Sequence, residues 1–187
     1  MNRCGWCGDD PLYVSYHDNE WGVPLKDDQA LFEFLILEGM QAGLSWITIL
    51  RKRENFRKAF AQFDPLKVAA FTENDYNRLM QDAGIIRNQL KIRAAINNAQ
   101  RFLETQKEYG SFANYIWSFV DHQPVINKWK AMKEIPAKTD LSDRISKDMI
   151  KRGYKFVGST IIYSHMQATG MVNDHTTECF RYNQLIG

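Results

Sequence analysis

The sequence contains few cysteines, and their number limits how the chain can be cross-linked. Only three occur among 187 residues, namely Cys4, Cys7 and Cys179. An odd number this small excludes a disulfide scaffold, so metal binding or simple burial remains as the use of these thiols.

Long apolar runs and an excess of one charge are also missing. No apolar stretch reaches the ~18 residues of a membrane span, and the N-terminal residues Met1–Trp6 resemble neither a signal peptide nor a transit peptide. With 24 Lys and Arg against 22 Asp and Glu, the net charge of +2 indicates no class of partner by itself. We expect a soluble, cytoplasmic protein that has no membrane partner.

Repeats, low-complexity tracts and linkers rich in Pro, Gly or Ser are absent as well, which predicts a single domain over residues 1–187. Hydrophobic residues make up 44% of the chain and aromatic residues 13%, which is enough for one sizeable core. The apolar spacing is helical nearly throughout, and it therefore predicts an all-α fold.

Start signals for several helices are visible, including Asp28 ahead of Leu31, Ser142, and Ser159 after a glycine. The first twenty residues and everything after Gly170 are predicted to be irregular. The expected helices are Asp28–Ala42, Ser45–Ala59, Pro65–Ala70, Glu73–Gln81, Asn88–Tyr109, Ser111–Phe119, Asp140–Arg152 and Ser159–Gly170.

The helix predicted from Asp28 carries an acid where an apolar side chain is expected. At ~100° per residue Leu31, Leu35 and Ala42 fall on one line, Glu38 lands inside the apolar arc, and Glu33 points the opposite way. A buried carboxylate costs several kcal/mol unless it is paired, hydrogen-bonded or protonated. Glu38 therefore has either a cationic partner in the core or a place in the wall of a pocket.

The residues that follow this helix favour the pocket. Gly43 permits a break in the backbone, and Leu44 then stands close to the indole of Trp46. A large apolar side chain beside an aromatic one is typical of the rim of a binding site.

Cysteine and histidine gather at the two ends of the chain. Cys4, Cys7 and His17 lie near the start, and His175 and Cys179 are four residues apart near the end, where one helical turn makes them neighbours. Zinc takes four nitrogen or sulfur ligands, and two from each end would hold the termini together. The spacing alone leaves the first pair open: it is Cys4 with Cys7, or either of them with His17. Ordinary burial of these residues is the alternative.

A helix-hairpin-helix unit is predicted around residues 75–93. The first helix stops at Gly84, and a four-residue turn leads to a second helix that begins near Asn88 and carries Lys91 and Arg93. Such units direct backbone N–H groups and the positive end of the second helix at an anion, for which a DNA phosphate is the obvious candidate. Two basic clusters could extend this face, although each alone is more often a solvated surface; they are Arg51–Arg53 with Arg57 and Lys58, and Lys151–Arg152 with Lys155.

Several separate motifs together resemble one known family. They are Arg3-Cys-Gly-Trp6, Asp10-Pro-Leu-Tyr13, Tyr16-His-Asp-Asn-Glu-Trp-Gly-Val-Pro24, Leu37-Glu-Gly39, Gln41-Ala-Gly-Leu-Ser-Trp-Ile47, Asp82-Ala-Gly-Ile-Ile-Arg-Asn88, Lys155-Phe-Val-Gly158 and Val172-Asn-Asp-His175. In this order they cover nearly the whole chain, and they resemble the bacterial DNA-3-methyladenine glycosylase I family.

This resemblance implies a fold, an activity and a set of site residues. The fold is that of the helix-hairpin-helix DNA glycosylases, with the terminal segments around 1–20 and 171–180 joined at one structural zinc per chain. The substrate is double-stranded DNA that contains 3-methyladenine, and we expect a monomer. The resemblance places the zinc ligands at Cys4, His17, His175 and Cys179, with Cys7 outside the set. It places the base pocket at Glu38 with Tyr13, Tyr16, Trp46, Trp6 and Trp21, and the DNA contacts at Leu44 and in the hairpin at Gly84, Ile86 and Lys91.

The implied chemistry suits these residue types. Methylation at N3 gives the purine a positive charge and makes it a good leaving group, and aromatic faces attract a cationic base that has been flipped out of the duplex. No lysine stands out as a Schiff-base nucleophile, and Glu104 and Glu108 lie in a polar helical stretch. We therefore expect a monofunctional enzyme that leaves an abasic site. The two alternatives are a zinc hydrolase with Glu38 or Glu20 as base, and a DNA-binding module without catalysis.

Overall fold

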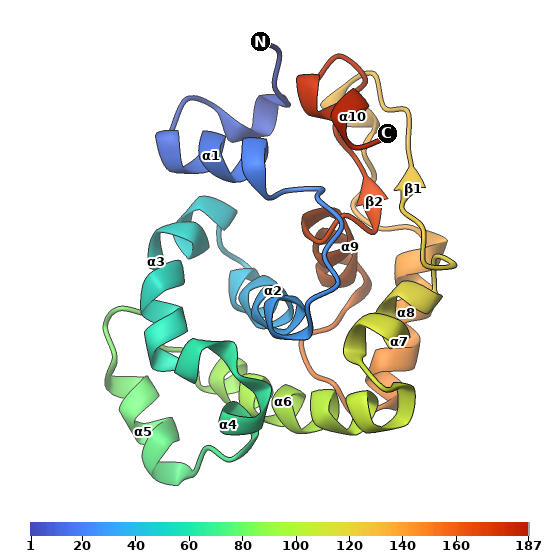
Figure 1. The fold of residues 1–187 in the computed structure, drawn as a ribbon. Coiled ribbons are helices and arrows are strands. Elements are labelled where there is room, and N and C mark those ends of the chain that lie inside the picture. Colours follow the sequence, from blue (N-terminus) through green and yellow to red (C-terminus); the bar gives the residue numbers. More distant parts are fainter. Residues whose placement is uncertain (187) are drawn as a thin grey trace.

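A computed structural model describes residues 1–186, and the fold is mostly helical, as predicted (Figure 1). Two short strands add a parallel pair in which Val125 faces Val172 and Ile126 faces Asn173. The α-helices are α1 (Pro11–Asn19), α2 (Asp28–Gln41), α3 (Trp46–Ala59), α4 (Pro65–Ala69), α5 (Glu73–Gln81), α6 (Gln89–Tyr109), α7 (Phe112–Ser118), α8 (Asp140–Lys151), α9 (Ser159–Ala168) and α10 (Phe180–Gln184). The other elements are the 3-10 turns η1 (Gly5–Cys7), η2 (Ala61–Phe63) and η3 (Met132–Glu134) and the strands β1 (Val125–Ile126) and β2 (Val172–Asn173).

Every predicted helix is present, with ends within two residues of those expected. The caps differ in detail. Asp27, and not Asp28, caps α2 by accepting the backbone N–H of Ala30. The cap of α8 is Thr139, while Ser142 completes a reciprocal capping box by accepting the Thr139 N–H.

The prediction that both ends of the chain are irregular is wrong. Pro11 occupies the first turn of α1, and the Asp10 carboxylate caps the helix by accepting the N–H groups of Leu12 and Tyr13. This nine-residue helix escapes a periodicity test because its apolar and polar residues do not separate onto two faces. The chain likewise becomes helical again after Cys179, in α10.

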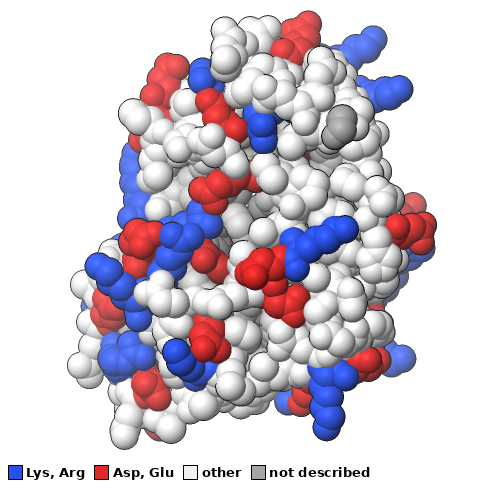
Figure 2. All heavy atoms as spheres, viewed as in Figure 1, with Lys and Arg blue, Asp and Glu red and all other residues white. Residues whose placement is uncertain are grey.

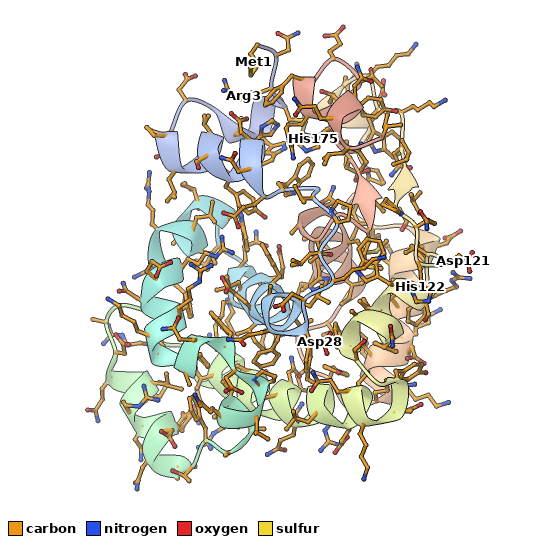
Figure 3. The ribbon with its side chains drawn as sticks, in the orientation of Figure 1. Met1, Arg3, Asp28, Asp121, His122 and His175 are labelled. Carbon is orange, nitrogen blue, oxygen red and sulfur yellow. The ribbon has the colours of Figure 1, made fainter. Side chains whose placement is uncertain are left out.

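Helix α2 lies at the centre of the molecule and is surrounded on all sides (Figure 1). Its residues from Leu31 to Met40 are all buried, against α3, α6, α7 and α9. Its first residue, Asp28, which is labelled in Figure 3, accepts the backbone N–H groups of Phe112 and Ala113 and an N–H of Gln106. These bonds fix the start of α2 against α6 and α7, and so fix the direction in which the helix presents Glu38.

The two ends of the chain meet at one end of the molecule, where α1 and α10 lie close together (Figure 1). The backbone N–H of Phe180 donates to the carbonyl of Asn2 at 3.0 Å. Residues separated by most of the sequence are thereby brought into one cluster.

Among residues 1–186 no helix combines the length and the apolar character that crossing a membrane requires. On the face shown in Figure 2, basic and acidic side chains are interspersed and do not gather into one basic field.

Candidate functional site

Four Cys and His side chains converge where the termini meet. Cys4, His17, His175 and Cys179 are buried, and their ligand atoms all lie within 4.8 Å of one another. The Sγ of Cys179 lies 3.4 Å from His17 Nε2 and 3.4 Å from His175 Nδ1, and Cys4 Sγ lies 3.5 Å from the same His175 nitrogen. These separations match the edge of about 3.6 Å that a tetrahedral site with Zn–S near 2.3 Å and Zn–N near 2.0–2.1 Å would have.

The outward-facing nitrogens of both histidines are also engaged, as a metal site requires. His17 Nδ1 lies 2.7 Å from the Asp18 carboxylate, which Arg3 holds with two N–H groups. His175 Nε2 lies 3.0 Å from the carbonyl of Trp21, and Figure 3 shows His175 between the terminal segments. Each ring therefore turns its other nitrogen inward, and that of His17 accepts the Cys4 backbone N–H at 3.3 Å.

The electrostatics of the cluster favour a thiolate. Hydrogen bonding from Cys4, together with bonds from His17 and His175, lowers the pKa of the Cys179 thiol. The thiolate is the form that binds metals. Cys7 lies outside the cluster, because its thiol donates to the carbonyl of Cys4 at 3.2 Å. The donor set thus fits a metal ion held by the four residues that the resemblance implies.

The turn from His175 to Cys179 differs from the expected one. These residues form a non-helical turn before α10, and not one turn of a helix. They converge because the Cys179 N–H closes onto the Thr176 carbonyl at 2.8 Å.

A pocket of about 240 Å³ opens beside this cluster. It is bounded by η1, α1, α2, α3 and α9 together with the segment around η3. All six residues predicted for the base pocket line it, and five more join them. The full set is Trp6, Tyr13, Tyr16, Trp21, Glu38, Gln41, Trp46, Met132, Ile135, Ser164 and Gln167.

Glu33 and Glu38, both on α2, show what is unusual about the pocket. Glu33 is buried, contrary to the expected outward position, and its carboxylate is neutralised by Arg53 at 2.5 Å and by Arg57 at 3.0 Å. Glu38 is 4% exposed, and within residues 1–186 it has neither an ion pair nor a hydrogen bond. Burial raises its pKa to about 8, so the group is mostly protonated near neutral pH. The acid that faces the pocket is the one without a partner.

The aromatic side chains make a close-packed wall around Glu38. The Trp6 ring lies 5.0 Å from Tyr13 and 5.0 Å from Trp21, and the Tyr16 ring lies 5.7 Å from Trp46. In the described part of the chain the indole N–H groups of Trp6 and Trp46 are buried without an acceptor. A polar ligand can supply one, since unpaired buried donors are rare without a function.

The rim of the pocket is formed by the turn between α2 and α3. Gly43 has φ +78°, a left-handed conformation that a side chain would strain, and Leu44 follows it with 39% of its surface exposed. Gln41 donates to the Leu44 carbonyl at 2.9 Å and fixes the turn. An apolar side chain is thereby held in solvent at the mouth of the pocket.

The predicted hairpin joins α5 to α6. Asp82 accepts the N–H of Gly84 at 2.8 Å, and Asn88 caps α6 by accepting the N–H of Lys91. A Cβ on Gly84 would lie 3.0 Å from the Asp82 carboxylate and 3.1 Å from the Asn55 side chain, which accounts for glycine at this position. Ile86 is half-buried at the tip of the turn.

Lys91 was expected to contact a DNA phosphate, but in the folded chain its side chain binds backbone carbonyls. Its ammonium donates to the carbonyls of Met40 at 2.8 Å and Ala42 at 2.6 Å, at the negative end of α2. Desolvation at this position lowers its pKa. Arg93 is engaged as well, because it pairs with Glu73 and lies 3.6 Å over the ring of Tyr76.

The arginines of the basic clusters suggested by the sequence are paired with acids. Arg51 pairs with Asp10, Arg53 with Glu20 and Glu33, and Arg152 with Glu108 and Asp148.

Sequence reasoning missed the far wall of the pocket. Met132 and Ile135 come from the segment between β1 and α8, and Ser164 and Gln167 lie one turn apart on α9. No signal in the sequence marks these residues, because their places in the wall depend on how α9 and the segment around η3 pack in the folded chain.

Comparison with known proteins decides the family. A model of the methyladenine glycosylase family matches residues 6–182. This chain belongs to the methyladenine glycosylase family. Two relatives within the family are the DNA-3-methyladenine glycosylase 1 of Escherichia coli strain K12, 57% identical over 97% of both chains, and the DNA-3-methyladenine glycosylase of Haemophilus influenzae, 47% identical over 95% of this chain and 96% of the other.

Solved structures of the methyladenine glycosylase family have the same fold. A crystal structure of a 3-methyladenine DNA glycosylase I matches with a TM-score of 0.93 at 55% identity, covering 96% of this chain and 98% of the other. A structure of the Staphylococcus aureus enzyme, described for its recognition of 3-methyladenine, also matches with a TM-score of 0.93, at 39% identity over 96% of each chain.

Proposed function

We propose that the protein is a DNA repair enzyme that hydrolyses the N-glycosidic bond of 3-methyladenine in alkylated double-stranded DNA. The observation that carries this proposal is Glu38, an unpaired buried acid in an aromatic pocket of a chain whose relatives are named 3-methyladenine DNA glycosylases. The pocket volume of about 240 Å³ suits one base, because pockets for larger ligands start near 300 Å³.

The charge of the lesion gives the pocket its selectivity. A purine methylated at N3 is cationic while it is attached to the sugar, and the faces of Tyr16 and Trp46 attract a desolvated cation by ~2 kcal/mol more than a neutral adenine. Glu38 holds a proton in the empty pocket because of its burial. A cation beside it favours the carboxylate, so binding of the lesion releases this proton and leaves a charge pair.

The reaction needs little further catalysis. Water adds to C1′ of the deoxyribose as the C1′–N9 bond breaks. The bonding electrons leave with the base and neutralise its positive charge, and the added water loses one proton to solvent as it becomes the C1′ hydroxyl. Glu38 in its ionised form stabilises the positive charge on the sugar and base as the bond opens. No lysine lines the described pocket, so the product is an abasic site in an uncut strand.

The surface around the pocket suits a duplex from which one nucleotide has been flipped. Leu44 stands at the mouth and fills the gap that the lesion leaves in the stack. The hairpin turn at Gly84 and Ile86 binds the backbone, because within residues 1–186 the N–H groups of Ile86 and Arg87 have no acceptor and α6 begins directly after them. Lys91 supports the Leu44 turn from behind.

We further propose that Cys4, His17, His175 and Cys179 hold one structural zinc per chain. Bound there, the ion would cross-link the terminal segments of what we take to be a single, monomeric glycosylase domain over residues 1–187. Four protein donors fill a tetrahedron, so this arrangement does not favour the zinc hydrolase, which needs an open position. A DNA-binding module without catalysis would leave the unpaired Glu38 without a purpose.

Release of free 3-methyladenine from methylated duplex DNA tests the proposal. The parent protein should release the base without cutting the strand. Glu38→Gln should fold but bind and excise the base about ten- to hundredfold less well, because one charged hydrogen bond is lost. Glu104→Gln, at an exposed glutamate, serves as the control. A parent that releases no 3-methyladenine contradicts the function, and a Glu38→Gln variant that matches the parent contradicts the role of Glu38.

A further inference from the structure

The described residues include a second buried acid, Asp174, whose partners lead to the pocket. Asp174 is fully buried and accepts four hydrogen bonds. Asn127 and Trp129 donate to Oδ1 at 2.6 and 2.8 Å, and the Tyr163 hydroxyl and Gln167 donate to Oδ2 at 2.5 and 2.8 Å. Two carboxylate oxygens offer about four acceptor positions, so this acid is saturated.

One of these donors, Gln167, also lines the base pocket. Its Nε2 is held by Asp174, while its carbonyl Oε1 has no hydrogen-bond partner within residues 1–186 and is not sealed from solvent. Gln167 lines the pocket and its Nε2 is bound to Asp174. We therefore infer that Oε1 is the atom that faces the pocket.

The direction of this amide is determined by its partner. Turning it over would bring Oε1 against Oδ2 of Asp174, where two acceptors repel and a saturated carboxylate has no proton to offer. One N–H of Gln167 Nε2 is held by Asp174, so the amide cannot turn over, and Oε1 stays the end without a partner in the described residues.

A fixed acceptor can read only one group on the proposed substrate. In a 3-methyladenine nucleotide N9 carries the sugar and N3 the methyl group, which leaves the exocyclic amine as the single N–H donor of the base. That amine has two hydrogens, one more than Glu38 alone can accept in a single bond.

We propose that Gln167 is a specificity-determining residue whose Oε1 accepts a hydrogen bond from the exocyclic amine of the base, and that Asp174 is the positioning residue that keeps this oxygen turned to the pocket. The inference rests on the proposed function and names how the same site distinguishes a 6-amino purine from a 6-oxo purine. A base with a carbonyl at that position meets the Gln167 oxygen with an acceptor and is rejected.

Binding of free 3-methyladenine and of its 6-oxo analogue 3-methylhypoxanthine, followed by tryptophan fluorescence, tests this. Gln167→Met keeps the length of the side chain and removes the acceptor. We expect its Kd for 3-methyladenine to rise about three- to tenfold, while the Kd for 3-methylhypoxanthine stays the same or falls. Gln100→Met is the matched control, because the Gln100 amide also donates through Nε2, to the Ala69 carbonyl at 3.4 Å, but lies outside the pocket.

A second variant tests the positioning role. Asn at position 174 can donate to Gln167 Oε1, which lets the Gln167 amide turn and offer Nε2 to the pocket. Asp174→Asn should therefore shift the ratio of the two Kd values toward the 6-oxo analogue beyond the shift seen in Gln167→Met. Thermal melts establish that each variant is folded before binding is compared.

The outcomes separate this inference from the proposed function. A parent protein that neither binds nor releases 3-methyladenine overturns both. With an active parent, a Gln167→Met variant that keeps the parental Kd ratio overturns only the inference. An equal loss of affinity for both bases does the same, because it assigns Gln167 to the shape of the pocket and not to recognition of the amine.

Discussion

Two acids five positions apart on α2 show how the partner of a side chain decides its chemistry. Glu33 is buried against two arginines, and Glu38 is buried in the wall of the pocket without a charged partner among the described residues. The same residue type on the same helix is therefore a structural ion pair in one case and a protonated, poised acid in the other.

The raised pKa of Glu38 predicts a pH-dependent stability. The ordinary value is 4.5 and the folded value is about 8, so the folded state holds a proton that the unfolded state releases between these limits. The contribution of Glu38 to stability is therefore fully present below pH 4.5 and is lost as pH rises toward 8, by up to ~1.4 kcal/mol per pH unit.

Glu38→Gln removes this dependence and should be more stable than the parent by a margin that grows from pH 5 to pH 8. Urea unfolding of both proteins at several pH values measures the margin, and other titrating groups cancel in the difference. A margin independent of pH would show that Glu38 is already ionised in the folded protein.

At the scale of elements, Lys91 connects the hairpin to the rim of the pocket. It begins on α6, directly after the hairpin, and its ammonium ends on the carbonyls of Met40 and Ala42, next to the turn that carries Leu44. We expect this Lys91 link to fix the position of the Leu44 side chain, which enters the duplex, relative to the DNA backbone bound at the hairpin.

Lys91→Met keeps the aliphatic stem but loses both hydrogen bonds. It should raise the KM for methylated duplex about tenfold, as Leu44→Ala should, while the affinity for free 3-methyladenine stays within about twofold of the parent. Lys91→Arg, which can donate to the same carbonyls, should restore part of the loss. If Lys91→Met weakens binding of the free base as much as binding of the duplex, the residue supports the pocket and not the rim.

At the scale of the whole molecule, the Cys and His cluster joins the first and last segments of the chain. Metal affinity at such a site is also folding free energy, because the four ligands are brought together only in the folded state. Figure 1 shows that the two terminal segments, which the cluster joins, lie together at one end of the molecule.

His175→Ala should lose the bound metal and lower Tm together, by on the order of 10 °C for a loss of several kcal/mol. Metal analysis and thermal melts of the same samples measure both. Cys7→Ala is the control and should retain one equivalent, because that thiol lies outside the cluster. Undiminished metal in His175→Ala would remove His175 from the ligand set.

The sequence alone determined most of the helices, the hairpin, the family resemblance and six residues of the pocket wall. It could do so because helical periodicity, caps and motifs are local properties of the chain, readable from neighbours a few positions apart. It also placed Glu38 inside an apolar arc. That position left two alternatives open for Glu38, a cationic partner in the core or a place in the wall of a pocket.

Only the tertiary structure made that choice, because the partner of a buried charge is set by contacts through space. In the folded chain Glu33 is paired and Glu38 is not. The Lys91 ammonium binds carbonyls at the end of α2, and the arginines of the basic clusters pair with acids. The tertiary structure also brought Gln167, held by Asp174, into the wall of the pocket that Glu38 lines. These residues lie far from Glu38 along the chain, so the chemistry of that wall exists only once α9 has packed against α2.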